Sequence, residues 1–507
     1  MSKDTEIDMK DVELNEMEPM TGDGKAAGGE KNGNLKQVPE DEVTFTGLSK
    51  EELMKVAGTP GWVRTRWVLL VLFWLGWVGM LAGAIVIIVQ APRCKPIPDM
   101  SWWNEGPMYQ ISDLKAFSEG IKGAEEKLDN LNQLKVKALV LGPLHTVQTG
   151  NPNTLSLEEI DPTQGTKEAL IDFLKKAQKK GISVVLDLTP NYPGGNAWFS
   201  TSNVADVMEK VKAAAEYWLG EGINGIKLSN IDVAISSSDW SKLQAVVQGN
   251  RTEDTKKRAL MGVVEHVTAA QVSQLVNSSG VDLIISDLLN NNSGGQERIE
   301  AMENLHSQQR SLGWGLGAAQ SVQLSKFAKT PALIRLYQLL LFTMPGTPVF
   351  TYGDEIGLQA GNGAKSPQMV WDIEKEPAEG TAVNETAEVE RTERVAVRKW
   401  FKSLSDLRGK ERSLLHGDYY PLHSSTSALS FLRLWDQSER YITAVNWGTE
   451  PKKLKLQLAP TEGVELPETA KVKLSTDPNL EADTTVNLDN INLGPEQAIL
   501  LQFPYTG

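Results

Sequence analysis

Cysteine and histidine are scarce in this chain of 507 residues, which contains one cysteine and five histidines. So few ligands exclude zinc sites built from Cys and His, iron–sulfur clusters and a framework of internal disulfides, and we expect no metal and no other cofactor. Positive charge is also in the minority, since 51 Lys and Arg against 65 Asp and Glu give a net charge of −14. Such a chain repels phosphate backbones, so we expect no nucleic-acid partner.

Charge is missing altogether from residues 67–89, which read WVLLVLFWLGWVGMLAGAIVIIV. As a helix this run spans ~34 Å, enough for a hydrocarbon core of ~30 Å. We therefore predict a single transmembrane helix. The alternatives fit less well, because a signal peptide has a shorter apolar core nearer the N-terminus and a buried globular helix is rarely so long without charge.

The flanks of this run predict its orientation. Four basic residues precede it closely and two follow it: Lys50, Lys55, Arg64 and Arg66, then Arg93 and Lys95. Because positive charge stays on the cytoplasmic side, residues 1–66 are predicted to be a cytoplasmic tail, largely disordered in its first 45 residues. All four N-glycosylation sequons follow the run, at Asn250, Asn277, Asn291 and Asn384. They favour an exoplasmic C-terminal part, although each can also be an unused triplet.

Three small residues on the predicted helix, Gly76, Gly79 and Gly83, form a strip with GxxxG spacing. A partner helix can approach such a strip closely, which predicts helix packing in the membrane. The alternative is that glycine is simply common in membrane helices.

The rest of the chain changes pattern twice. After a proline-rich stalk at 90–101, short β-branched or Leu-rich runs alternate with amphipathic segments to about residue 410. This alternation predicts an α/β fold, a (β/α)8 TIM barrel over 102–410. Residues 411–507 instead show alternating runs separated by turn residues, which predicts an antiparallel β-sandwich domain. The candidate strands are 107–111, 138–144, 183–188, 225–228, 258–264, 282–288 and 347–352, then 428–435, 440–447 and 453–458; the candidate helices are 166–180, 204–219, 296–309 and 330–342.

Specific motifs in the barrel region resemble the α-amylase family. WWNEGPMYQISDLKAF at 102–117 is similar to the first strand and helix of that family, DLTPNY at 187–192 to the block after strand three, and MPGTPVFTYGDEIGL at 344–358 to the strand-eight block. The resemblance implies an α-amylase-type barrel with chemistry at the C-terminal ends of the strands.

The catalytic positions implied by that resemblance have changed chemistry. In GIKLS, Lys227 stands at the position of the family's arginine and Ser229 at that of its nucleophile, where a hydroxyl cannot replace a carboxylate. Val263 stands at the position of the acid, which leaves Glu265 two residues further, ~6.6 Å along a strand. Residues 311–320, near strand seven, lack the expected His-Asp pair. Asp187 survives, but a lone carboxylate at a strand end is more often a hydrogen-bonded structural group. We therefore expect no catalytic residue.

The single cysteine, Cys94, lies five residues beyond Val89. On the oxidising side of a membrane an unpaired thiol predicts a disulfide to another chain. An idle exposed thiol remains open, and so does palmitoylation, which needs the opposite topology.

Taken together, the single helix, one-cysteine stalk, altered barrel and ending (ERSLLHGDYY at 411–420, LQFPYTG at 501–507) resemble the heavy subunits of heteromeric amino-acid transporters. The resemblance implies a type II glycoprotein of the plasma membrane, linked through Cys94 to a multi-spanning light chain that it brings to the surface. It also implies association with β-integrins. Two alternatives remain: an ectoglycosidase using displaced acids such as Glu265 or Asp232, and an adhesion or signalling receptor working through its tail.

Overall fold

The computed structural model describes residues 49–90, 94–200, 203–249, 257–290, 295–359, 366–374, 385–458 and 464–505. The chain forms two compact units, 1–92 and 93–507, and each is considered by itself. The predicted disordered tail over the first 45 residues lies outside the described residues.

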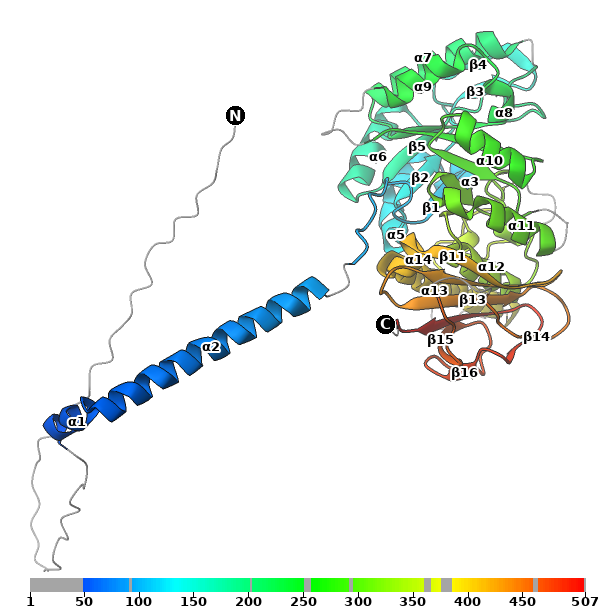
Figure 1. The fold of residues 1–507 in the computed structure, drawn as a ribbon. Coiled ribbons are helices and arrows are strands. Elements are labelled where there is room, and N and C mark those ends of the chain that lie inside the picture. The colour runs from blue at the N-terminus through cyan, green and yellow to red at the C-terminus, as the bar shows by residue number, and fades with distance from the viewer. Residues whose placement is uncertain are drawn as a thin grey trace, which may run out of the picture. The chain divides into compact units, whose positions relative to one another are not determined.

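The described part of the first unit is helical (Figure 1). A short helix, α1 (Lys50–Ala57), begins with a capping box in which Ser49 and Glu52 each bond the other's backbone N–H. The apolar helix, α2, runs over Pro60–Gln90 and is long and apolar enough to cross a membrane. The helix starts earlier than the predicted Trp67 because proline suits the first helical turn. Arg64 and Arg66 end the uncharged run, but arginine is a good helix former, so the helix continues through them.

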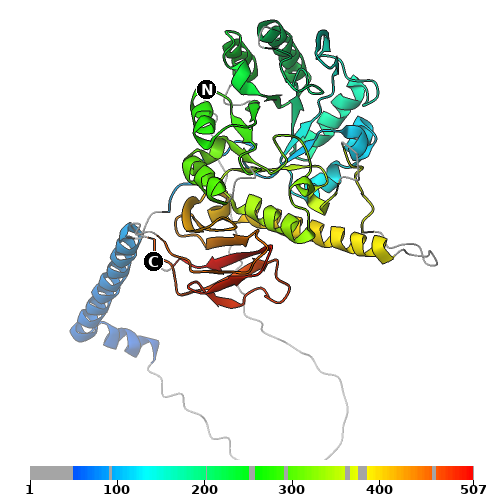
Figure 2. The same ribbon diagram turned by 90° about the vertical axis from the view of Figure 1, so that its right-hand side faces the viewer.

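The second unit contains the predicted barrel, eight parallel strands closed in the order β1-β10-β9-β8-β7-β6-β5-β2 (Figures 1 and 2). This order confirms the predicted fold class. Six of the strands lie inside their predicted ranges, and β6 extends one residue beyond its range. The seventh strand of the barrel, β9, lies inside residues 311–320. The bounds of the strands are β1 (Met108–Ile111), β2 (Ala138–Leu141), β5 (Ser183–Asp187), β6 (Gly225–Ser229), β7 (Ala259–Val264), β8 (Leu283–Ser286), β9 (Leu312–Trp314) and β10 (Thr347–Thr351). A hairpin of β3 (Thr146–Gln148) and β4 (Asn151–Ser156) follows β2.

Helices separate the barrel strands as predicted, and Thr166 and Thr330 cap two of them by accepting bonds from backbone N–H groups. The predicted helix 296–309 is α11 followed by a 3-10 segment, His306–Ser311. The helix α13, rich in charge, was not predicted. The α-helices of this unit are α3 (Leu114–Ser118), α4 (Ile121–Glu126), α5 (Leu128–Gln133), α6 (Lys167–Lys179), α7 (Val204–Gly220), α8 (Ile231–Ala234), α9 (Trp240–Gln248), α10 (Ala269–Ser278), α11 (Gly295–Leu305), α12 (Pro331–Thr343), α13 (Glu385–Lys410) and α14 (Arg412–His416).

The C-terminal strands form the predicted antiparallel β domain, drawn in orange to red (Figure 2). A six-stranded sheet has the order β11-β12-β13-β18-β15-β16, and β14 pairs with β17 in a second, smaller sheet. The predicted strand 453–458 is shorter than expected, since only its start belongs to β14. The bounds are β11 (Asp418–Ser424), β12 (Ala428–Leu434), β13 (Arg440–Asn446), β14 (Lys452–Leu454), β15 (Thr469–Ser475), β16 (Thr485–Asn487), β17 (Ile491–Leu493) and β18 (Gln497–Phe503).

Both faces of the larger sheet are buried. Along β12, Leu429 and Phe431 pack into the same apolar cluster as the barrel helices, whereas Ala428 and Leu432 pack with residues of β14 and β17. Successive side chains of a strand point to opposite faces, so β12 contributes to two separate apolar clusters. The first of these clusters contains residues of both the barrel helices and the β domain, which therefore share one hydrophobic core.

Candidate functional site

The carboxyl ends of β5 and β6 carry a buried ion pair. Asp187 and Lys227 lie side by side in the strand register, and Lys227 Nζ donates to Asp187 Oδ2 at 2.9 Å. The two residues are 3 % and 2 % exposed. The charge of Lys227 is therefore neutralised by Asp187. The pair lies at the end of the barrel where TIM barrels carry their chemistry.

Hydroxyl groups complete this network. Asp187 Oδ1 accepts from the Thr189 backbone N–H at 2.9 Å and from its hydroxyl at 2.6 Å. Thr189 Oγ1 lies 3.1 Å from Ser229 Oγ and accepts from the Ser229 backbone N–H at 3.1 Å. Lys227 Nζ also donates to Ser321 Oγ at 3.3 Å. Both Asp187 oxygens are therefore engaged within the protein, as expected for a structural carboxylate. Thr189 and Ser321 were not predicted, because nothing in their local sequence marks them.

The position of the expected acid is apolar. Val263 is fully buried in a cluster that includes Met261 of the same strand and Ile285 of the neighbouring strand β8. Glu265 lies beyond the end of β7, which ends at Val264. The predicted shift of ~6.6 Å along a strand therefore does not apply to Glu265. Glu265 is half-buried, and burial followed by the nearby Asp287 carboxylate raises its pKa above the ordinary value. A raised pKa is what a general acid needs.

The other displaced acid, Asp232, is exposed on α8. The neighbour of Glu265, Asp287, accepts from the His266 backbone N–H with both carboxylate oxygens, at 3.0 and 3.1 Å. Within the described ranges, no group of three or more His, Cys, Asp and Glu side chains could hold a metal ion. Of the two displaced acids, Glu265 is therefore the half-buried one and Asp232 the exposed one.

Close to the single cysteine, the stalk is fastened to the β domain. Cys94 is exposed, and the next residue, Lys95, makes three contacts. Its backbone N–H donates to Asp436 at 3.0 Å, its Nζ lies 3.5 Å from a carboxylate oxygen of Asp418, and the same Nζ lies 4.5 Å from the ring centre of Trp435. These partners lie more than 300 residues away in sequence, so no local signal marks them. They hold the chain at a defined place directly after the thiol.

The remaining predicted positions lie on the surface or outside the description. Asn277 is exposed near the end of α10, where its Oδ1 accepts from Gln308 at 3.2 Å. The other sequons, Asn250, Asn291 and Asn384, lie outside the described residues. Gly76, Gly79 and Gly83 lie on α2, and a Cβ added at any of them meets no atom within 4 Å.

Comparison with known proteins finds two matching family models. One, described as the N-terminus of solute carrier family 3 member 2, matches residues 34–109, and the other, described as the catalytic domain of alpha amylase, matches residues 113–240.

Curated relatives match over long stretches. The amino acid transporter heavy chain SLC3A2 of Mus musculus is 44 % identical, covering 100 % of both chains. The amino acid transporter heavy chain SLC3A1 of Homo sapiens is 22 % identical, covering 80 % of this chain and 78 % of its own.

Among solved structures, an alpha-amylase from Geobacillus thermoleovorans complexed with acarbose is similar in fold. It covers 81 % of this chain and 100 % of its own, with a TM-score of 0.59 and 18 % identity. At this identity the likeness concerns the fold alone.

Proposed function

The chain belongs to the family of amino acid transporter heavy chains, and from this premise we propose that it is the non-catalytic heavy subunit of a heteromeric amino-acid transporter. Its partner is a multi-spanning light chain that carries the substrate. Transport sites lie near the bilayer midplane between several helices, and the described residues contain one helix long enough to span a membrane. The heavy subunit therefore supports the light chain's delivery to the surface and its stability.

Cys94 carries this proposal. It is the only cysteine of the chain, so a disulfide can form only with another molecule. Its thiol is exposed, and the Lys95 contacts hold it at a defined place on the second unit. An exposed thiol outside the cell is readily oxidised, so an interchain bridge to the light chain is its expected state.

The proposed topology follows from charge. Residues 1–66 are cytoplasmic, 67–89 span the plasma membrane, and the stalk (90–101), barrel (102–410) and β domain (411–507) lie outside the cell. Glycans on Asn250, Asn277, Asn291 and Asn384 are part of this proposal. So is packing of the light chain on Gly76, Gly79 and Gly83.

The non-catalytic role is supported by the buried ion pair. A retaining glycosidase needs a nucleophilic carboxylate and an acid about 5–5.5 Å apart. At the strand ends Ser229 offers a hydroxyl, Val263 a methyl pair, and Asp187 is bound to Lys227. These contacts leave no carboxylate in the position of the nucleophile.

The deciding experiment compares non-reducing and reducing gels of the protein from its native membrane. We expect a heavier band that collapses on reduction, contains a multi-spanning amino-acid transporter by mass spectrometry, and is absent from a Cys94→Ser variant. A band unchanged by reductant would contradict the disulfide. Failure of any such transporter to co-purify in mild detergent would contradict the subunit role itself.

The raised pKa of Glu265 favours a second candidate, an ectoglycosidase. The test incubates the purified protein with maltose and aryl α-glucosides. Turnover that is lost in a Glu265→Gln variant would establish the enzyme. We expect no turnover in either protein.

Association with β-integrins is proposed from the resemblance of the sequence to the heavy-chain family. Co-precipitation from surface-labelled cells tests it, and the Cys94→Ser variant serves as a control for capture through the light chain. Failure of the intact chain to precipitate any β-integrin would contradict this part of the proposal.

A further inference from the structure

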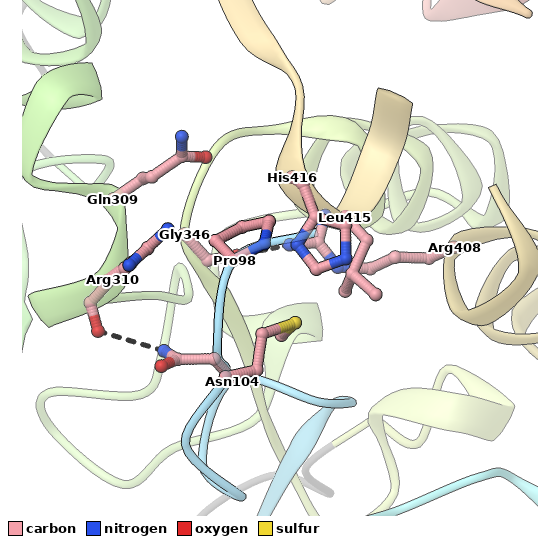
Figure 3. A pocket seen from close by; sticks show the side chains of 9 residues that line it. Pro98, Asn104, Gln309, Arg310, Gly346, Arg408, Leu415 and His416 are labelled. Atoms are coloured by element: carbon pink, nitrogen blue, oxygen red, sulfur yellow. Dashed lines mark hydrogen bonds between the residues drawn. The ribbon is translucent and has the colours of Figure 1, made fainter. Parts of the chain in front are cut away.

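A small cavity lies at the N-terminal ends of β1, β9 and β10, opposite the end where TIM barrels carry their chemistry. Its volume is about 40 Å³, and the stalk passes through its lining (Figure 3). In this view Gln309 and Arg310 lie on one side of Pro98, and His416 and Arg408 on the other. None of the residues that line it is acidic; its polar side chains are those of Asn104, Gln309, Arg310, Arg408 and His416.

One wall is a buried arginine that has no carboxylate partner among the described residues. Arg408, from α13, is 3 % exposed and donates to the backbone carbonyl oxygens of Phe342 and Met344 at 2.6 and 3.0 Å, and to that of Gly346. Its Nε has no hydrogen-bond partner. Burial lowers the pKa of Arg408 to about 10, so the group is still charged at neutral pH.

A second buried arginine adds to this charge. Arg433, from β12, donates to the carbonyl oxygens of Thr343 and Gly417 at 2.8 and 2.9 Å, and its Nε also lacks a partner. Burial, followed by the charge of Arg408, holds the pKa of Arg433 well below its usual range. Both arginines bind carbonyl groups at the C-terminal end of α12, whose dipole offers about half a negative charge. The hydrogen bonds of both arginines therefore go to neutral carbonyl groups.

The surface of the cavity is positive as well. Burial, and then the charges of four arginines, lower the pKa of His416: Arg310, Arg408, Arg412 and Arg433. The acid that acts on Arg433 is Asp418, which is half-exposed and already lies 3.5 Å from Lys95. An unmatched buried charge is costly, so a counter-ion at this place would stabilise the fold.

We propose that this cavity is a binding site for one small inorganic anion, chloride in size and charge, held between Arg310, Arg408 and the amide side chain of Gln309. The amide of Asn104 is already occupied, since its Nδ2 donates to the Arg310 carbonyl oxygen and to Thr347 Oγ1, each at 2.9 Å. The volume suits such an ion with a water or two, since one water occupies at least ~10–15 Å³ measured in this way. A bound anion would join the stalk to the barrel and to α14. It would act as a structural counter-ion, and this role is independent of the transporter partner.

The test measures thermal unfolding of the full-length chain in detergent. Sodium chloride replaces sodium gluconate at constant ionic strength, because gluconate is too large for the cavity. We expect the midpoint to rise saturably by about 2 °C in chloride, and in bromide as well. Equal midpoints in chloride and gluconate would overturn the site. Stabilisation by sulfate but not by chloride would overturn the assignment to a halide.

Two arginine variants locate the effect. Arg310→Gln removes an exposed arginine that lines the cavity, and we expect it to abolish the saturable rise. Arg412→Gln removes the same charge from the same neighbourhood but does not line the cavity, so it should keep the rise. An unchanged chloride response in Arg310→Gln, or equal losses in both variants, would contradict a discrete site.

Discussion

Lys227 and Asp187 depend on each other because almost no water reaches either charge. Asp187→Asn should lower the free energy of unfolding by about 3–5 kcal/mol, since it leaves the Lys227 ammonium buried beside a neutral group. Urea denaturation of the purified chain measures the loss.

The control removes both charges. A double variant, Lys227→Met with Asp187→Leu, replaces the pair by apolar side chains of similar size and should be far less destabilised than the single variant. A loss below about 1 kcal/mol in Asp187→Asn would indicate that solvent screens the pair, as it does at a surface.

Lys95 is the residue expected to position the thiol of Cys94. Lys95→Met keeps the aliphatic stem and the backbone bond to Asp436 but removes the ion pair with Asp418 and the contact with Trp435. We expect the disulfide-linked form to appear more slowly in a pulse-chase experiment on non-reducing gels, because the thiol is held less firmly.

Lys95→Arg should restore the normal rate, since a guanidinium can also pair with Asp418 and stack on Trp435. Lys453→Met, an exposed lysine on β14, is the matched control. Identical rates in Lys95→Met and the parent chain would remove Lys95 from this role.

At the scale of the element, α2 offers a test of the glycine strip that leaves this chain's own fold untouched. A Cβ added at Gly79 meets no atom within 4 Å, so Gly79→Leu should leave the helix itself unstrained. After reduction of the disulfide, we expect co-purification of the light chain to fall by roughly fivefold to thirtyfold, the effect of losing about 1–2 kcal/mol of helix packing.

The matched control is Ala84→Leu, which introduces the same side chain about 140° around the helix from Gly79. Equal losses in both variants would indicate a general effect of bulk in the membrane. No loss in Gly79→Leu would mean that the light chain packs elsewhere.

For the whole molecule, the shared core predicts that the barrel and the β domain unfold together. Phe431 is fully buried on the face of β12 that packs with the barrel cluster. Phe431→Ala should cost about 3–5 kcal/mol and shift one calorimetric transition, because its cavity lies in the core of both parts. Thr485→Ala, on the exposed edge strand β16, should leave the transition unchanged. A second transition at the parent temperature would show that the barrel unfolds alone.

Much of the candidate site could be predicted from sequence because motifs are local. GIKLS placed Lys227 and Ser229 at the end of one strand, and LMGVV placed Val263 in the next, where the structure has them. Glu265 was misjudged because strand spacing applies only within a strand, and β7 ends at Val264. The ion pair between Asp187 and Lys227 could not be predicted, because it depends on how β5 and β6 align.

By itself, the sequence determined the apolar helix, the order of strands and helices, and the change to an antiparallel domain, since hydrophobic periodicity reports each element's own burial. Only the tertiary structure decided what the elements bury against. The larger sheet is covered on both faces, Lys95 contacts Asp436 of the β domain, and two buried arginines donate to carbonyl groups at the end of α12. Such contacts join distant segments, and their free energy arises only when the chain has folded.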